Sequence, residues 1–205
     1  ASILGVNPFD QPEVDAAKIR TRALIEDFEL KGGLSDEVPV CSNSNLQIFS
    51  RMPEELVGKT GERRQDVTDC LAAYLKMINP GDYFAVNAFV EMNFANMVLL
   101  QKIRHLVRDG TKVATTLGFG PRFLHSTGQL HKGGPNSGVF LYITADDPKD
   151  FQIPGRKYTL GLLKRFQAKV DVSVVAEKGR RVLRVHVGPD VIAGLSALHD
   201  NLALA

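Results

Sequence analysis

Two polar side chains near the start of the chain have the spacing of a small binding site. Gln11 and Lys18 lie seven residues apart, and Pro12, a residue suited to the first position of a helix, follows Gln11 directly. In a helix that begins at Pro12, both side chains lie on one face, about 10.5 Å apart along the axis. Lys18 borders the apolar stripe of that helix, so its ammonium group can reach a ligand in a partly buried site. Spacing alone favours the alternative, in which its methylene chain covers the edge of the core.

A glycine-rich stretch, residues 118–138, carries a second group of candidate side chains. We expect a long loop without regular structure, which is unusual inside a compact domain unless the loop has a function. The stretch follows a predicted strand, where α/β sheets bind their ligands. Glycine lets the backbone approach a ligand, Ser, Thr and Arg hold phosphate oxygens, and histidine exchanges protons near neutral pH. The candidates are Arg122, His125, Ser126, Thr127 and Gln129.

Two other kinds of site fit the same stretch poorly. His125 and His131 have no obvious third ligand nearby, so we predict no metal. Residues 133–138 lack the Gly-Lys-Ser/Thr sequence that opens a helix in phosphate-binding loops, and we predict no cofactor. A purely structural turn explains the composition of the stretch equally well.

The elements that must position these side chains alternate between helix and strand. Hydrophobic periodicity and turn residues predict helices over 12–29, 66–78, 94–109, 157–169 and 189–202, a short helix over 172–178, and strands over 46–49, 82–90, 112–117, 139–144 and 181–187. This alternation predicts an α/β three-layer sandwich with a largely parallel sheet, preceded by an amino-terminal helix and an irregular arm. We divide the chain into 1–30, a turn-rich linker or arm over 31–63, and an α/β domain over 64–205.

Composition narrows the class of protein. The net charge is only +2 and the basic residues are dispersed, which gives no argument for nucleic acid or an acidic membrane surface as a partner. The two cysteines, Cys41 and Cys70, form no CxxC motif, so we expect inert thiols in a reducing, cytoplasmic setting. No apolar run reaches the roughly 18 residues that a membrane helix needs.

The segment from Leu4 to Pro12, continuing to Lys18, resembles the closing signature of glucose-6-phosphate isomerases, Asn-x-Phe-Asp-Gln followed seven residues later by an active-site lysine. The resemblance implies that Gln11 contacts the sugar phosphate and that Lys18 assists ring opening and stabilises charge on a substrate oxygen. It also implies that residues 1–30 are the end of an isomerase domain.

The segment Leu124–Gln129 resembles the Leu-His-Ser-x-Gly-Gln segment of shorter members of that family, and residues 134–140 and 158–164 are similar to later parts of the same sugar-isomerase-like domain. There the histidine comes from a neighbouring subunit and helps to open the sugar ring. The resemblance therefore implies that His125 is catalytic and that the protein is a homodimer.

The order of the two segments departs from that of ordinary isomerases, in which the histidine segment comes first. The order seen here is similar to the carboxy-terminal region of bifunctional transaldolase/glucose-6-phosphate isomerases. This resemblance implies interconversion of glucose 6-phosphate and fructose 6-phosphate through an enediolate. The family's base-bearing glutamate and Ser/Thr-rich phosphate loop have no match in the chain, so we expect a fragment that is inactive alone. A non-catalytic sugar-phosphate-binding module and a dimerisation domain, with the arm over 31–63 wrapping a partner, remain as alternatives.

Overall fold

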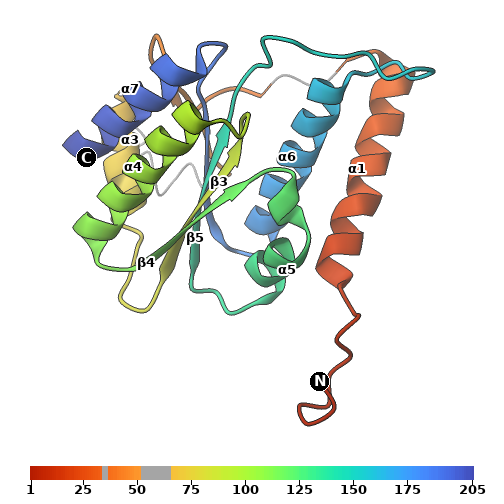
Figure 1. The fold of residues 1–205 in the computed structure, drawn as a ribbon, viewed down its shortest axis with the longest axis horizontal. Helices are drawn as coiled ribbons and strands as arrows, with labels where there is room; N and C mark the ends of the chain where they lie inside the picture. Colours follow the sequence, from red (N-terminus) through yellow and green to blue (C-terminus); the bar gives the residue numbers. More distant parts are fainter. Residues whose placement is uncertain (34–36, 52–65) are drawn as a thin grey trace.

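A six-stranded sheet forms the middle layer of the protein (Figure 1). The computed structural model describes residues 1–33, 37–51 and 66–205. Four neighbouring strands are parallel, and two short strands extend the β6 side of the sheet in antiparallel fashion, giving the order β1-β2-β6-β5-β3-β4. The strands are β1 (Cys41–Ser42), β2 (Gln47–Phe49), β3 (Tyr83–Phe89), β4 (Ala114–Phe119), β5 (Gly138–Thr144) and β6 (Arg181–His186).

Helices cover both faces of the sheet (Figure 1). One layer is formed by α3 (Val67–Leu75), α4 (Phe94–Thr111) and α7 (Val191–Leu204). The other layer is formed by α1 (Pro12–Lys31), α5 (Ser126–Gly133) and α6 (Leu160–Glu177), with the short 3₁₀ helix η1 (Arg122–Leu124) beside α5. The predicted α/β three-layer sandwich with a largely parallel sheet is confirmed.

The central strands explain why the sheet lies between two helical layers. Every residue of β5 is buried, as expected for a parallel strand that is covered on both faces. Because successive side chains of a strand point to opposite faces, β3 contributes to two cores. Phe84 and Val86 pack toward α3, α4 and α7, whereas Ala85 and Phe89 pack on the side of α5 and α6. Each large apolar side chain of this kind contributes about 1.5–3 kcal/mol when fully buried.

Local signals set the helix ends as predicted. Pro12 is the first residue of α1, and Gly32 ends it in a left-handed conformation with φ of 74°. Asn93 caps α4, its side-chain oxygen accepting a hydrogen bond from the backbone N–H of Asn96 at 2.9 Å.

The prediction of a long loop over 118–138 is wrong. β4 continues to Phe119, and η1 and α5 follow it. Packing leaves little room for a side chain at the glycine inside α5. A Cβ at Gly128 would lie 3.0 Å from the Lys132 Nζ and 3.1 Å from the Phe123 carbonyl oxygen. Glycine here reflects the close approach of two elements rather than a flexible backbone.

The predicted break between helices 157–169 and 172–178 is also wrong, because α6 is one continuous helix. The polar residue at the apparent break, Asp171, is buried inside the protein and pairs there with a lysine. A charged side chain on a buried helix face resembles a helix end when only the sequence is read.

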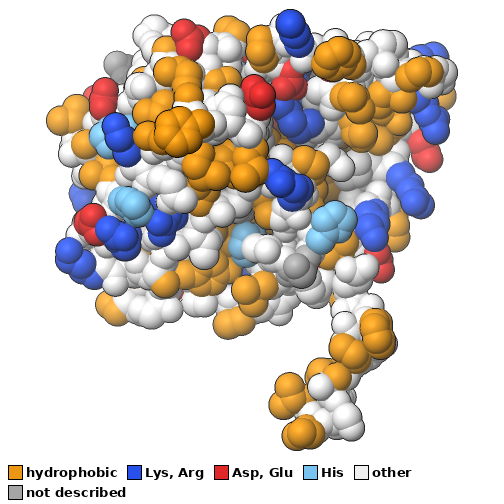
Figure 2. Space-filling view, viewed as in Figure 1, with side chains coloured by type: hydrophobic (Ala, Val, Ile, Leu, Met, Phe, Trp, Pro, Cys, Tyr) orange, Lys and Arg blue, Asp and Glu red, His pale blue; other side chains and the backbone are white. Residues whose placement is uncertain are grey.

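Part of the predicted arm belongs to the sheet. The strand predicted over 46–49 is confirmed as β2, which pairs with β6, whereas 34–36 and 52–63 lie outside the described residues. α1 packs against α5 and α6, and the segment before it projects from the body with exposed apolar side chains that include Ile3 and Phe9 (Figures 1 and 2). The domain boundaries stay a prediction. In the described part of the chain, no helix combines the length and apolar character needed to cross a bilayer.

Candidate functional site

A cavity of about 360 Å³ lies between α1, the turn that contains η1, and α6. α1 places Lys18 and Arg22 in its wall, and the turn before α5 adds Arg122 and His125. Val14, Ala17, Leu124 and Val170 supply its apolar surface. Residues from the two segments singled out in the sequence, more than a hundred positions apart, therefore meet around one space.

Lys18 lies at the rim of this cavity with half of its side chain exposed. Its Nζ forms an ion pair with Asp15 Oδ1 at 3.0 Å, one turn earlier on α1. An exposed ion pair of this kind contributes only about 0–1 kcal/mol to stability. A ligand can therefore replace Asp15 as the partner of the ammonium group with little loss of free energy.

The cavity has an excess of positive charge. Lys18, Arg22 and Arg122 are cationic, and the exposed His125 adds an imidazole. The carboxylate in the lining, Asp171, is already paired with Lys132 in the core. A half-enclosed space with several cations and apolar walls suits a small molecule that carries a phosphate group.

A buried ion pair lies beneath the cavity, and no sequence motif predicts it. Lys132 Nζ lies 2.5 Å from Asp171 Oδ1, and both side chains are almost completely buried. The Tyr142 hydroxyl donates a hydrogen bond to the second oxygen of Asp171. This network joins α5, β5 and α6 directly below the cavity. The signal that could have revealed it is an aspartate placed among Val170, Val172, Val174 and Val175.

His131 is also buried in this region, among aromatic rings. Its ring lies 4.8 Å from that of Phe140, and Asn87 Nδ2 lies 3.5 Å from its Nδ1. Burial, followed by the charge of Lys132, lowers the pKa of His131 to about 4. The imidazole is therefore neutral at pH 7.

We expect His131 to make the fold sensitive to acid. The unfolded chain takes up a proton on this histidine near its usual pKa of 6.5, whereas the folded chain does so only near a pKa of about 4. Stability therefore falls as the pH drops through this window, by roughly 3 kcal/mol at its lower end. Urea denaturation between about pH 7 and pH 4.5 should show a shallower loss for His131→Phe than for the unaltered chain. His199→Gln, in α7, is the control, and equal slopes for all three chains would contradict the expectation.

The structure places Gln11, Thr127 and Gln129 outside the cavity lining. Gln11 is exposed just before α1, and Thr127 is exposed on α5. Gln129 accepts a hydrogen bond from the backbone N–H of Glu13 at 3.2 Å, so it ties α5 to the first turn of α1. Ser126 begins α5, and its side chain lies outside what the structure describes. Lys18, Arg122 and His125 are thus brought together, whereas substrate contacts by Gln11, Ser126, Thr127 and Gln129 stay predictions.

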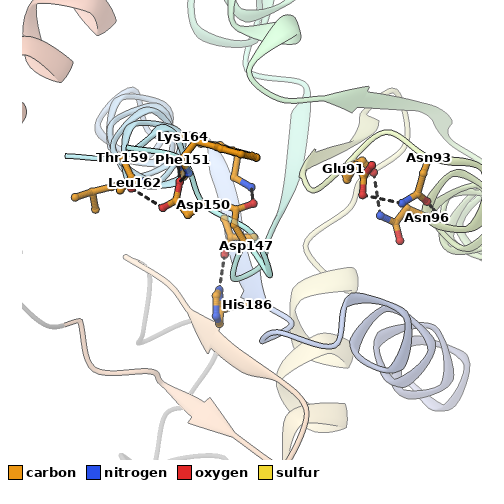
Figure 3. A network of polar contacts seen from close by, with 12 residues as sticks. Glu91, Asn93, Asn96, Asp147, Asp150, Phe151, Thr159, Leu162, Lys164 and His186 are labelled. Atoms are coloured by element: carbon orange, nitrogen blue, oxygen red, sulfur yellow. Dashed lines mark hydrogen bonds and ion pairs between the residues drawn. The ribbon is translucent and has the colours of Figure 1, made fainter. Parts of the chain in front are cut away.

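Ligands usually bind at the carboxyl edge of the parallel strands in such sheets. In this protein that edge is acidic, unlike the cationic cavity between α1 and α6. A cavity of about 580 Å³ lies there, and its charged lining consists of Lys164 with Glu91, Asp146, Asp147 and Asp190. Figure 3 shows Asp147 beside Lys164, to which it is paired, with Glu91 and its amide neighbours across the edge. Four carboxylates against one lysine repel phosphate. Among the described residues, no group of three or more His, Cys, Asp or Glu side chains is arranged to hold a metal.

Comparison with known proteins bears on the fold. No protein-family model and no curated protein matches the chain. The crystal structure of hypothetical protein TT0462 from Thermus thermophilus is similar, with a TM-score of 0.53 and 20% sequence identity over 67% of this chain. The likeness shows the fold alone. The matched region spans 38% of the TT0462 chain.

Proposed function

We propose that the chain is the carboxy-terminal part of a glucose-6-phosphate isomerase, and that the cavity between α1 and α6 binds the sugar phosphate. One observation supports this proposal. Lys18 lies on the helix that follows the Asn-Pro-Phe-Asp-Gln segment, and it lines the same cavity as Arg122 and His125. The two segments resemble the family independently of their positions in space. Their convergence is what a shared substrate site requires.

Each side chain has a chemical role in this proposal. Arg122, with Arg22, holds the phosphate through charge-assisted hydrogen bonds. His125 exchanges a proton with the sugar as the ring opens, and the Lys18 ammonium stabilises negative charge on the substrate oxygen of the enediolate.

The described lining of this cavity offers no free carboxylate that could move the proton between C1 and C2. Its carboxylate, Asp171, is held by Lys132 and Tyr142. In the full-length protein another segment provides the base. The order of the two motifs supports a transaldolase/isomerase fusion as the full-length protein. The cytoplasmic setting and the homodimer are proposed separately, from the cysteine usage and from the family resemblance, with His125 acting in the cavity of its own chain.

Ligand binding tests the site without requiring turnover. Titration calorimetry with fructose 6-phosphate should show binding to the 205-residue chain, weakened roughly tenfold by Lys18→Ala and by Arg122→Gln. Lys157→Ala is the matched control, because Lys157 contacts the backbone of Glu29, beyond the cavity, near the carboxyl end of α1. Equal affinities for Lys18→Ala and Lys157→Ala, or no binding at all, would refute the site.

A non-catalytic sugar-phosphate-binding module is the second candidate. It is favoured by the same engagement of Asp171, which leaves the described lining of the cavity with cations to bind phosphate and without a free carboxylate base. The two candidates differ in what His125 does in the full-length protein.

A further inference from the structure

A separate cavity of about 220 Å³ lies on the α6 side of the sheet, where β5 and β6 end. Arg165 and Lys169 enter it from successive turns of α6, and Arg184 enters it from β6. The carboxylate in its lining is that of Glu37. Among the described residues of this lining, three cationic side chains face one carboxylate.

Arg184 is held in place rather than free to move. Its guanidinium lies 3.8 Å over the ring of Phe49, on the neighbouring strand β2, and its Nη1 lies 3.5 Å from Thr144 Oγ1. Its side chain is only 14% exposed. Burial lowers the pKa of the Arg184 guanidinium, Glu37 acts in the opposite direction, and Arg165 lowers it further. A guanidinium that is held in place, and whose positive charge is only partly neutralised, is preorganised to bind an anion.

Glu37 occupies that position. One of its oxygens lies 2.5 Å from Arg184 Nη2 and the other 3.5 Å from Lys169 Nζ. The carboxylate thus bridges two cations as a bound anion would. Its side chain is 42% exposed and belongs to a segment outside any helix or strand, so it can leave without disturbing the sheet.

The remaining charged neighbours leave room for a ligand. Within the described ranges, Arg165 is exposed and has no carboxylate at ion-pair distance. His186 Nδ1 lies 3.1 Å from Thr144 Oγ1, and its Nε2 lies 3.5 Å from Asp146. Figure 3 shows His186 directed toward the carboxylates that follow β5. Burial lowers the pKa of His186, so it offers a neutral ring to the cavity.

We propose that Arg165, Lys169 and Arg184 bind the phosphate group of a small phosphorylated metabolite, which displaces the Glu37 carboxylate. This site differs from the sugar-phosphate cavity, although α6 contributes to both through different residues. It does not rest on the isomerase assignment.

Phosphate titration in a background in which the first cavity has lost the charges of Lys18 and Arg122 tests the site. The chain carrying Lys18→Ala and Arg122→Gln is titrated with inorganic phosphate and followed by calorimetry. Arg165→Gln should weaken binding roughly tenfold, because one charge-assisted contact is lost, and Glu37→Gln should strengthen it severalfold, because the competing carboxylate is removed. Arg165 is chosen because it is exposed, whereas loss of the packed Arg184 would perturb the fold itself.

Arg108→Gln is the matched control, since it removes the same charge from the exposed surface of α4. Equal affinities for the Arg165 and Arg108 variants, or no phosphate binding, would overturn the site. Unchanged affinity in Glu37→Gln would overturn the displacement of Glu37. Fructose 6-phosphate should bind in the same background at least as well as inorganic phosphate, and binding of inorganic phosphate alone would exclude a sugar phosphate as the ligand.

Discussion

Replacing Asp171 by asparagine lowers the free energy of unfolding by about 3–5 kcal/mol. The substitution preserves shape but leaves the Lys132 ammonium, which is almost fully buried, without its counter-charge. A charge that is buried without a partner has lost its hydration and has no opposite charge to replace it. Urea denaturation at about pH 7, followed by far-ultraviolet circular dichroism, measures the loss.

Two further variants show whether the buried charge is the cause. Asp15→Asn removes the carboxylate of an exposed pair with Lys18 and should cost at most about 1 kcal/mol. Combining Asp171→Asn with Lys132→Met removes both charges and should recover much of the lost stability. A loss for Asp171→Asn no greater than that for Asp15→Asn would show that the buried pair does not have this role.

Under the proposed isomerase function, Lys18→Ala and His125→Ala are each expected to lower turnover of fructose 6-phosphate by the full-length protein by about 10²-fold. Both side chains are exposed enough at the cavity rim for the fold to tolerate their loss. A coupled assay of glucose 6-phosphate formation measures the rate, with Lys157→Ala as the control that leaves the cavity intact. The 205-residue chain alone should show little or no conversion, because the described lining of its cavity offers no free carboxylate to act as the base.

The results for His125 separate the two candidate functions. A wild-type rate for His125→Ala would remove its catalytic assignment and, together with stabilisation of the chain by fructose 6-phosphate, would favour the binding module. Measurable isomerase activity of the isolated chain would contradict the view that its base lies elsewhere.

Elements defined by local signals could be predicted from the sequence. The apolar run over 139–144 and the Asn93 cap before 94–109 depend on neighbours within one strand or one turn, and both are present. α5 could not be predicted in this way, because the glycine at 128 reflects the space left by Lys132 and Phe123, which is tertiary information. Pairing of β2 with β6 depends on residues distant in sequence as well.

The candidate site was predictable only in part, for the same reason. Lys18 and His125 were found through their segments, and the structure shows a cavity between them. Gln129 is of a residue type that often binds ligands, but its side chain accepts a hydrogen bond from the first turn of α1 instead. The buried partnership of Lys132 with Asp171, and the acidic character of the strand ends, emerge only when separate elements are brought together.

The attachment of β2 to β6 has a consequence for how the chain is made. Ile48, fully buried in the finished protein, pairs with Val185, so its partner strand emerges from the ribosome more than 130 residues later. Closing so long a stretch is slow compared with forming the neighbouring helices. Throughout that interval β2 lacks the neighbour that covers its backbone edge and Ile48, and an apolar segment of this kind can recruit other nascent chains or chaperones.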